Sequence, residues 1–449
     1  MDVVILAAGK STRMKSKTSK VLHKILGKPI LSYVVELAEE IKANKSIVVI
    51  APGNEEIPAL YGDRLLYATQ WDQKGTGDAL KAAVGKISSD TTLVLYGDAP
   101  FLRPESLEGF IEFHKGKDLS ILSVCQENPK GYGRIIRGEK GVEGIVEEKD
   151  CNPEQRKIKE INSGILLMNS ELMKENLQKI TTSNSQGEYY LTDLVELFYA
   201  QGKIVDAYVI DDPEETAGVN DRAQLARGGK VFQKRIIEEH LKEGVSIIDP
   251  DRVYIEPEVE IAPDVEIWPD TYLLGKTKIE EDVRLGPGVH LEDSHIMRGA
   301  VLEHTRGIQA QVGCDSRVGP YAYLRPGTKI GAGCRIGDFV EIKNSTIGDG
   351  TKVSHLSYIG DADLGENINV GCGTIFVNYD GVNKYRSTVG DGAFLGCNSN
   401  LISPVEIGAN AFVAAGTTVD QKVPENALSI GRVRSEIKLD WNKARNRRK

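Results

Sequence analysis

The chain of 449 residues is long enough for two or three domains, because a single hydrophobic core stops growing well before that size. Its 40% hydrophobic and 27% charged residues are typical of a soluble protein, and its net charge of -9 argues against a nucleic-acid partner, which would need a basic face. Because the sequence has no run of 18 apolar residues, no signal-peptide pattern and no C-x-x-C pair, we expect no membrane span, a cytoplasmic location and reduced cysteines.

The first half of the chain alternates strand and helix signals. Apolar runs predict buried strands at 3–6, 46–50 and 92–96, and helical spacing predicts a helix at 30–40. This alternation predicts an α/β domain over 1–222 with a mainly parallel sheet, in which ligands bind beyond the carboxyl ends of the strands. Residues 223–243 carry an apolar stripe among charges, so they predict a helical linker that ends at Gly244.

From 244 to 449 the apolar period changes to six. The clearest stretches are Val312, Val318, Leu324, Ile330, Ile336 and Ile342, then Ile347, Val353 and Ile359, and finally Val389, Leu395, Leu401, Ile407, Val413 and Val419. One inward residue per short strand, with a turn after each, predicts stacked coils around a continuous core. The rhythm stops at 376–388, where we expect a loop that leaves the column. The period resembles that of hexapeptide acyltransferases, which implies a left-handed parallel β-helix and a trimer.

The loop after the first strand has two interpretations. Residues 9–12 look like the end of a P-loop, but Val4 stands where that motif needs its first glycine. A nucleotidyltransferase loop fits better, because Ala7, Ala8 and Gly9 are small enough for backbone amides to approach a nucleotide. A tight turn with surface charges is the simpler alternative for this stretch taken alone.

Positive charge follows in the same loop. Arg13 and Lys20 are suited to neutralising a polyphosphate. The stretch resembles the pattern LAAG-x-G-T-R-M followed by P-K of uridine-sugar pyrophosphorylases. It departs from that pattern at Ser11, where glycine is usual, and at Ser19, where proline is usual, while both cations remain.

Two further motifs in this half suit a nucleotide and a metal ion. Gln70 could read a pyrimidine edge with its amide, and Gly75 and Thr76 could lie under the base. Asp98 follows an apolar strand, where a carboxylate can hold Mg²⁺ together with substrate phosphates. A turn residue is the alternative interpretation of Asp98.

Together with the segments 131–134, 145–150, 160–164 and 218–220, these motifs resemble a known family in order and spacing over essentially the whole chain. It is the family of bifunctional bacterial enzymes that join an N-acetylglucosamine-1-phosphate uridylyltransferase to a glucosamine-1-phosphate N-acetyltransferase. The resemblance implies a Rossmann-like nucleotidyltransferase domain, a helical linker and an acetyltransferase β-helix, within the boundaries given above.

The resemblance also implies the reactions. Glucosamine-1-phosphate would be acetylated with acetyl-CoA. Uridylyl would then pass from UTP to N-acetylglucosamine-1-phosphate with release of pyrophosphate. The sugar-phosphate oxygen would attack the α-phosphorus directly, so no protein nucleophile is needed, and Mg²⁺, Arg13 and Lys20 would neutralise charge. The product would feed peptidoglycan and lipopolysaccharide-type envelope polymers.

Residues of the uridylyl site are implied by the same resemblance. Contacts to UTP or UDP-N-acetylglucosamine would come from Leu6, Ala7, Ala8, Gly9, Lys20, Gln70, Gly75, Thr76 and Tyr96. The sugar would be held by Gly133, Glu147 and Asn162, and Mg²⁺ by Asp98 and Asn220.

The off-pattern polar residues of the second half predict an acetyl-transfer site, although a bare scaffold is the alternative. Acetyl transfer to an amine needs a base, which His355 could supply with Glu341 as its orienting partner. Asn378 is a candidate oxyanion donor. Positive charge for a sugar phosphate would come from Arg325, Lys343 and Lys384.

The resemblance adds the remaining contacts of this second site. It places the sugar phosphate at Arg325, Lys343, Tyr358 and Asn369, and the acyl donor near Cys372, Asn378, Tyr379, Cys397, Ala415 and Arg432. Cys372 and Cys397 stand where alanine and serine are usual, so they alter the coenzyme A pocket or create an oxidisable thiol. Direct transfer needs no acetyl-cysteine intermediate.

Two rival functions remain open at this point. One is a single-site nucleotidyltransferase whose β-helix serves regulation or assembly, which His355 and the loop at 376–388 argue against. The other is a γ-class carbonic anhydrase, whose zinc needs three histidines on adjoining coils. The histidines at 290, 295, 304 and 355 lack clear one-coil spacing. We expect a homotrimer with acetyl-transfer sites shared between chains.

Overall fold

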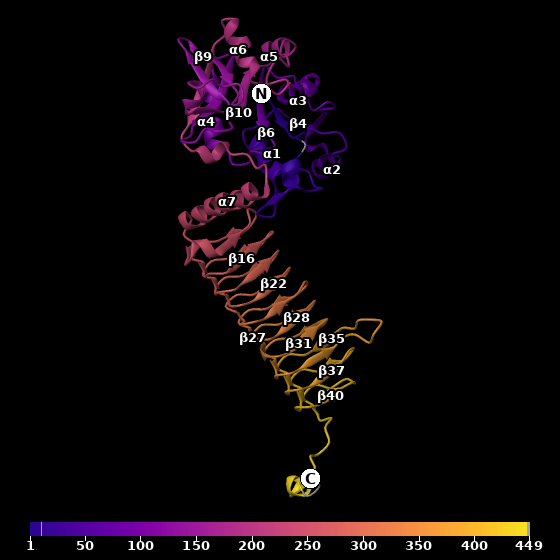
Figure 1. The fold of residues 1–449 in the computed structure, drawn as a ribbon. Helices are drawn as coiled ribbons and strands as arrows, with labels where there is room; N and C mark the ends of the chain where they lie inside the picture. The colour runs from indigo at the N-terminus through magenta and orange to yellow at the C-terminus, as the bar shows by residue number, and fades with distance from the viewer. Residues whose placement is uncertain (10, 447–449) are drawn as a thin grey trace. The chain divides into compact units, whose positions relative to one another are not determined.

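A computed structural model describes residues 1–9 and 11–446, so Lys10 of the first loop lies outside the described residues. The chain divides into two compact units, one ending at Phe232 and one beginning at Gln233 (Figure 1). This division falls inside the long helix α7 (Arg222–Lys242), which covers the predicted linker. Gly244 follows the helix with a φ of 94°, a conformation that suits glycine and ends the helix.

The first unit is built on a mixed sheet with the strand order β11-β7-β10-β6-β1-β4-β5. The strands are β1 (Asp2–Leu6), β4 (Lys45–Ile50), β5 (Leu66–Thr69), β6 (Thr91–Tyr96), β7 (Leu119–Cys125), β10 (Glu160–Asn169) and β11 (Val205–Ile210), with a hairpin of β8 (Arg134–Gly138) and β9 (Gly141–Val146). The predicted strands and their parallel pairing are confirmed around β1, which lies between β4 and β6. Strand β10 runs antiparallel to β6 and β7.

Helices cover both faces of this sheet, as continuous apolar strands require. One core contains side chains of α1 (Ile30–Glu40), α2 (Glu56–Tyr61) and α4 (Pro104–His114). The other contains side chains of α3 (Thr76–Ala83), α5 (Ser170–Leu177) and α6 (Asp193–Ala200). Alternate residues of β1 belong to the two cores, so the strand is buried on both sides. Helix α1 matches the predicted helix at 30–40.

The second unit is a parallel β-helix. Within the described residues it contains three parallel sheets of 11, 10 and 9 strands, which form three faces of a column (Figure 1). Successive coils are 18 residues apart where Val318 pairs with Ile336. The predicted hexapeptide positions are buried in one continuous core, which confirms the period. Helix α8 (Trp441–Asn446) follows the column.

The strands that carry the second site belong to all three faces. The first face includes β27 (Arg335–Asp338), β30 (Lys352–His355), β33 (Asn369–Val370), β36 (Phe394–Leu395), β39 (Phe412–Val413) and β41 (Leu428–Ser429). The second includes β25 (Tyr323–Leu324), β28 (Glu341–Lys343), β31 (Tyr358–Gly360), β34 (Ile375–Val377) and β37 (Asn400–Ile402). The third includes β29 (Thr346–Ile347), β32 (Ala362–Leu364), β35 (Ser387–Val389) and β38 (Glu406–Ile407).

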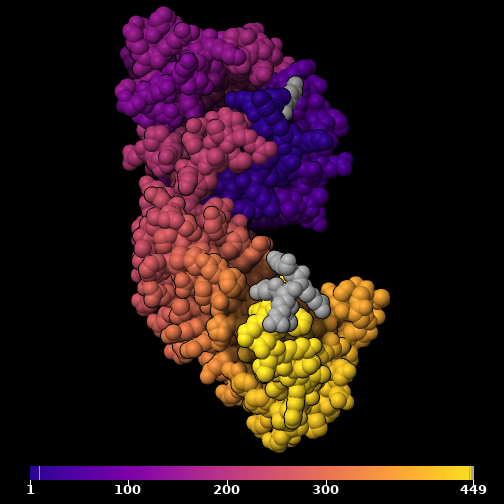
Figure 2. Space-filling view, turned by 60° about the horizontal axis from the view of Figure 1, so that its bottom comes forward, coloured from indigo at the N-terminus to yellow at the C-terminus, as the bar shows by residue number. Residues whose placement is uncertain are grey.

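The predicted loop leaves the column between β34 and β35 and stands out as a lobe (Figure 2). It is shorter than expected, because Phe376 is fully buried in the column and belongs to β34. An antiparallel bridge between Tyr379 and Lys384 makes the loop a small hairpin. No helix in the described part of the chain is long and apolar enough to cross a membrane.

Candidate active sites

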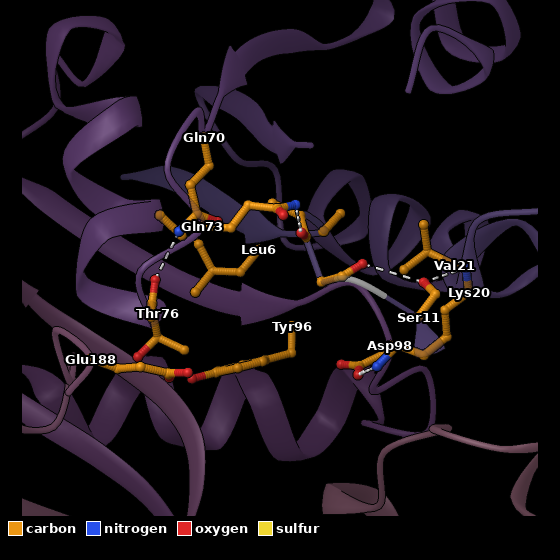
Figure 3. A pocket seen from close by; sticks show the side chains of 15 residues that line it. Leu6, Ser11, Lys20, Val21, Gln70, Gln73, Thr76, Tyr96, Asp98 and Glu188 are labelled. Atoms are coloured by element: carbon orange, nitrogen blue, oxygen red, sulfur yellow. Dashed lines mark hydrogen bonds and ion pairs between the residues drawn. The ribbon is translucent and has the colours of Figure 1, made fainter. Parts of the chain in front are cut away.

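A cleft of about 340 Å³ lies at the carboxyl ends of β1, β5 and β6 (Figure 3). Its position follows from the parallel strands, whose ends leave a crevice between the loops that follow them. Its lining consists of Leu6, Ala7, Ala8, Gly9, Ser11, Lys20, Val21, Gln70, Gln73, Gly75, Thr76, Ala79, Tyr96, Asp98 and Glu188. Every residue predicted to contact the nucleotide lines this cleft, so the structure brings that set together.

The first loop explains both departures from the pyrophosphorylase pattern. Ser11 has a φ of 53°, a left-handed conformation in which glycine costs least, and its hydroxyl accepts a hydrogen bond from the backbone of Lys20 at 3.0 Å. Ser19 has a φ of -54° and a ψ of 140°, which are values that proline favours. The two serines therefore keep the backbone shape of the usual residues, and the Ser11 hydroxyl ties the loop together.

The segment 70–77 forms the opposite wall. The side-chain amide of Gln70 donates to the carbonyl of Gly75 at 2.9 Å and to the carboxylate of Asp78 at 2.8 Å. Both amide hydrogens are thus used, so its carbonyl oxygen remains to meet a ligand. Gly75 has a φ of 105°, and a Cβ there would lie 2.6 Å from the carbonyl oxygen of Tyr189. No other residue fits this position without moving the backbone.

Two cations and two oxygen ligands meet at the end of the cleft. The ammonium of Lys20 is paired with Asp98 and donates to the side-chain oxygen of Asn220 at 3.0 Å. Arg13 donates to the same oxygen at 2.9 Å. Asp98 and Asn220 thus face one cationic position. The described residues contain no group of three or more His, Cys, Asp or Glu side chains that could hold a metal, so an ion here needs further oxygens from substrate.

The residues predicted to hold the sugar lie together beside the cleft. The backbone of Asn162 donates to the carbonyl of Gly133 at 2.9 Å, and a Cβ at Gly133 would lie 3.3 Å from the Glu147 carboxylate. Burial raises the pKa of Glu147. Burial also raises the pKa of Tyr96, and the carboxylates of Glu147 and Asp98 add to the effect. Tyr96, which lines the nucleotide cleft, therefore lies near Glu147.

In the β-helix, predicted site residues contact one buried carboxylate, that of Asp361. Asp361 is 7% exposed and accepts hydrogen bonds from Asn378 and, at 2.6 Å, from Asn344. The ammonium of Lys343 lies 3.5 Å from its carboxylate. Burial acts to raise the pKa of Asp361, but these hydrogen bonds and the Lys343 charge outweigh it and lower the pKa. Asp361 therefore fixes the loop residue Asn378 against the column.

Positive charge gathers around this carboxylate. Lys384, on the protruding loop, has a lowered pKa because its amino group lies within hydrogen-bonding reach of Lys343, and Arg325 adds to the repulsion. Arg325 is itself paired with Glu341 at 2.8 Å. The hydroxyl of Tyr358 lies beside the side chain of Asn378, since both would contact a Cβ at Gly360. These cations can bind one phosphate.

The predicted partner of His355 is wrong. His355 Nδ1 lies 2.8 Å from a carboxylate oxygen of Asp338, whereas Glu341 is paired with Arg325. The register explains the difference, because Asp338 and His355 are paired neighbours on β27 and β30, while Glu341 lies on the next face and is paired with Tyr358. The hydrogen bond from His355 lowers the pKa of Asp338.

Four of the six residues predicted near the acyl donor lie at one corner of the column. Cys372, Cys397 and Ala415 hold equivalent turn positions after β33, β36 and β39, which are paired in register. Arg432 donates to the carbonyl of Ala415 at 2.7 Å. Asn378 and Tyr379, also predicted there, lie apart from them on the protruding loop.

Asn369 is not brought to the sugar-phosphate cluster within one chain. It lies on β33 of the first face, paired with Lys352 and Phe394. By contrast, Lys343 and Tyr358 belong to the second face. The predicted sugar-phosphate residues are therefore divided between two faces of the column.

Several site residues were missed by the sequence analysis. Asp338 and Asp361 belong to no motif, and only their pairing in the coils gives them a role. Gln73 donates to the carbonyl of Ala8 at 2.7 Å, and its place in the segment 70–77 was the available signal. Glu188 reaches the cleft because Tyr189 is hydrogen-bonded through its backbone to Lys74 and Gly77, which no sequence pattern indicates.

The comparisons with known proteins agree with both halves of the fold. Residues 3–137 match the MobA-like NTP transferase domain, and residues 309–344 and 386–421 match the bacterial transferase hexapeptide repeat. Over 446 residues the chain is 44% identical to the bifunctional protein GlmU of Brevibacillus brevis, which covers 98% of this chain and 97% of that protein.

Two further relatives match over nearly the same span. The bifunctional GlmU proteins of a Geobacillus species and of Acetivibrio thermocellus are each 46% identical over 443 residues, covering 98% of this chain and 96% of theirs. The chain belongs to the GlmU family. It is a bifunctional enzyme of UDP-N-acetylglucosamine synthesis, a uridylyltransferase and a glucosamine-1-phosphate N-acetyltransferase. Its second unit is the left-handed β-helix of hexapeptide transferases.

Proposed function

We propose that the cleft of the first unit binds UTP, N-acetylglucosamine-1-phosphate and Mg²⁺, and that the corner of the β-helix binds acetyl-CoA beside a glucosamine-1-phosphate site. The first assignment rests on one observation. The side chains of Lys20, Asp98, Asn220 and Arg13 meet at the end of a cleft that is partly lined by glycines. The second rests on the cluster of cations around Asp361.

In uridylyl transfer, the chain's residues position two substrates and neutralise charge. The carbonyl oxygen of Gln70 accepts from the N–H of the uracil ring, and the loop 7–9 contacts the nucleotide through backbone amides. The sugar-phosphate oxygen attacks the α-phosphorus in line, and pyrophosphate leaves. Arg13 and Lys20 stabilise the charge that develops on the phosphates.

The donor set at the cleft suits Mg²⁺. Asp98 and Asn220 would hold Mg²⁺ through their side-chain oxygens, and the substrate phosphates would supply further oxygen ligands. The ion when bound would supply charge neutralisation on the phosphates. The ammonium of Lys20 lies against the oxygens of Asp98 and Asn220, so we expect the lysine to turn toward the substrate phosphates when the ion binds.

In acetyl transfer, His355 takes a proton from the amine of glucosamine-1-phosphate as the amine attacks the thioester carbonyl. Asp338 holds the imidazole through Nδ1, which leaves Nε2 as the base. Asn378 uses one amide hydrogen on Asp361 and offers the other to the oxyanion. Coenzyme A leaves as its thiol. Lys343, Lys384 and Arg325 hold the sugar phosphate.

We further propose a homotrimer in which acetyl-transfer sites are shared between chains. Asn369 and the cation cluster face different sides of one column, so a single chain does not enclose the substrate. On the same face as Asn369, Phe394 and Phe412 stack at 4.5 Å and are 38% and 45% exposed. A second copy would cover this apolar surface.

The free state of the described cysteines supports a cytoplasmic location.

The test is a set of omission assays on the full chain. The protein is mixed with glucosamine-1-phosphate, acetyl-CoA, UTP and Mg²⁺, each reagent is left out in turn, and the products are identified. We expect UDP-N-acetylglucosamine only from the complete mixture and N-acetylglucosamine-1-phosphate without UTP or without Mg²⁺. Formation of the nucleotide sugar in the presence of a chelator would contradict the metal assignment. Loss of both products without Mg²⁺ would contradict separate sites.

A further inference from the structure

Cys372 and Cys397 occupy the same position in the turns of two successive coils. Strands β33 and β36, which precede these turns, are paired in register. The next residues, Gly373 and Asn398, both have positive φ, at 76° and 54°, and the backbone N–H of Asn398 donates to the carbonyl of Cys372 at 2.8 Å. The two turns therefore have matching backbone shapes and stack directly.

This stacking brings the two thiols within reach of a disulfide. Neighbouring parallel strands lie about 4.8 Å apart, and disulfides join Cα atoms about 4.4 to 6.8 Å apart. Both cysteines are free, Cys397 is exposed and Cys372 is half-buried. A bond between them closes the gap between adjacent coils without a change in their register.

The pair lies beside the proposed general base. His355 has the equivalent turn position on the preceding coil, next to its partner Asp338, and Ala415 has it on the following coil. The corner therefore carries His355, Cys372, Cys397 and Ala415 on successive coils. A bridge between the two cysteines would stand where acetyl-CoA passes on its way to His355.

We propose that Cys372 and Cys397 form a reversible disulfide that blocks acetyl transfer and leaves uridylyl transfer intact. The blocking effect rests on the acetyl-CoA pocket proposed above, whereas formation of the bond depends only on the stacked turns. The site would make the first reaction respond to low-molecular-weight disulfides and leave the second reaction running.

The bond forms by two exchange steps. The thiolate of Cys397, the more exposed group, attacks a small disulfide and releases one small thiol, which leaves a mixed disulfide on Cys397. The thiolate of Cys372 then attacks the Cys397 sulfur and releases the second small thiol. Two electrons pass from the cysteines to the small disulfide, and the two cysteine protons end on the two released thiols. Dithiothreitol reverses both steps.

The experiment treats the full-length enzyme with glutathione disulfide and follows thiols and both activities. Free thiols are alkylated, the protein is digested without reductant, and the peptides that contain Cys372 and Cys397 are sought as a linked pair. We expect the linked pair, a loss of two alkylatable thiols, a fall of at least tenfold in acetyl transfer, and full recovery in dithiothreitol. Uridylyl transfer should stay within twofold.

Single variants separate the bond from simple thiol damage. Cys372→Ala and Cys397→Ser introduce the small residues usual at these positions in the resembled family. Each variant is compared with itself before and after oxidation: neither can form the linked pair, and Cys397→Ser, which cannot take the first exchange step, should not lose acetyl transfer tenfold. Cys125→Ser removes an exposed cysteine of the other unit and should respond as the parent does.

Three outcomes would overturn the proposal. If Cys397 takes up glutathione and no linked pair forms, or if neither thiol reacts, the turns do not allow the bond. If the pair forms and acetyl transfer is unchanged, the bond does not block the reaction. If Cys397→Ser loses acetyl transfer as the parent does, another thiol is responsible. An untreated enzyme without acetyl transfer would instead refute the proposed function and leave the linked-peptide result to stand alone.

Discussion

The two halves of this enzyme build their sites in different ways. In the first unit, loops after parallel strands surround a cleft, and the residues predicted to contact the nucleotide all line it. In the β-helix, the predicted residues lie on two faces and a corner of a column whose surface is made of short strands and turns. The loops at the edge of a twisted sheet form a crevice by themselves, whereas the side of a straight β-helix is an open surface.

This difference determines how each site can fail. The cleft depends on a few residues that converge within one chain, so a single substitution should silence it. The acetyl-transfer site depends on the register between coils and on the protruding loop, so substitutions there should act by displacing neighbouring side chains. The comparison also predicts that only the second site can be restored by mixing subunits.

The largest effect is expected from Asp98→Ala. This change removes the carboxylate that Lys20 and the proposed Mg²⁺ share, and loss of metal-assisted charge stabilisation costs several kcal/mol, or roughly 10³-fold in rate. Uridylyl transfer should fall by at least that factor while acetyl transfer stays within twofold, as measured by separate assays of pyrophosphate and coenzyme A release. Asp72→Ala, which removes an exposed carboxylate paired with Lys74, is the matched control. Equal loss of both activities would refute independent sites.

The reverse pattern is expected from His355→Ala. Loss of a general base typically costs roughly 10²- to 10⁴-fold, so acetyl transfer should fall by that range at saturating substrate with uridylyl transfer unchanged. Asp338→Asn should cost less and shift the pH profile, because the imidazole keeps its place and loses its charged partner. His295→Ala removes a half-buried histidine that is also paired with a carboxylate at 2.7 Å, and it should change neither activity. A His355→Ala enzyme that still releases coenzyme A at near-parent rates would remove His355 from the base role.

Mixing inactive subunits tests the sharing of the second site. His355→Ala and Lys384→Ala chains are dissociated, mixed in equal amounts and reassembled. If each site takes these residues from two chains, about a quarter of the sites should regain both groups by random pairing. Acetyl transfer should recover to that fraction, while a mixture of Asp98→Ala with Lys20→Ala should recover no uridylyl transfer. No recovery of acetyl transfer despite verified exchange would mean that one chain supplies both groups.

The smallest effect concerns Asp193, at the start of α6 beside the sugar residues. Burial, with the charges of Glu196 and Glu147, raises its pKa to about 6. The ionised form is therefore disfavoured in the folded state, so Asp193 lowers stability as pH rises from about 4 through 6. After allowance for partial exposure, Asp193→Asn should stabilise the protein by about 1 kcal/mol at pH 8.

Thermal unfolding of the full chain at pH 8 and pH 4.5 checks this sign. The gain of Asp193→Asn over the parent should be largest at pH 8 and smaller at pH 4.5, where Asp193 is largely protonated in the folded protein. Glu171→Gln changes an exposed carboxylate in the first turn of α5 and serves as the control. A gain that is equal at both pH values would show that the raised pKa is not its cause.

The sequence alone determined the two architectures and most of the first site. Apolar runs and the six-residue period are local patterns, and each directly reports which side chains a strand or coil buries. The loop at 7–9, the segment 70–77 and Asp98 follow strands of one sheet, so topology alone brings them to one edge. The resemblance over the whole chain then supplied the roles of these residues.

Only the tertiary structure decided which side chains meet on the β-helix. Asp338 rather than Glu341 holds His355, and Asp361 gathers Lys343 and Asn378, because pairing between coils 17 or 18 residues apart sets these contacts. The protruding loop lies between Cys372 and Cys397 in the chain. Because the loop lengthens their separation to 25 residues, the six-residue period does not indicate that they stack. The register between coils exists only in the assembled column. If one coil shifted by one residue, each side chain would face a different neighbour on the next coil, although the apolar pattern of the sequence would stay the same.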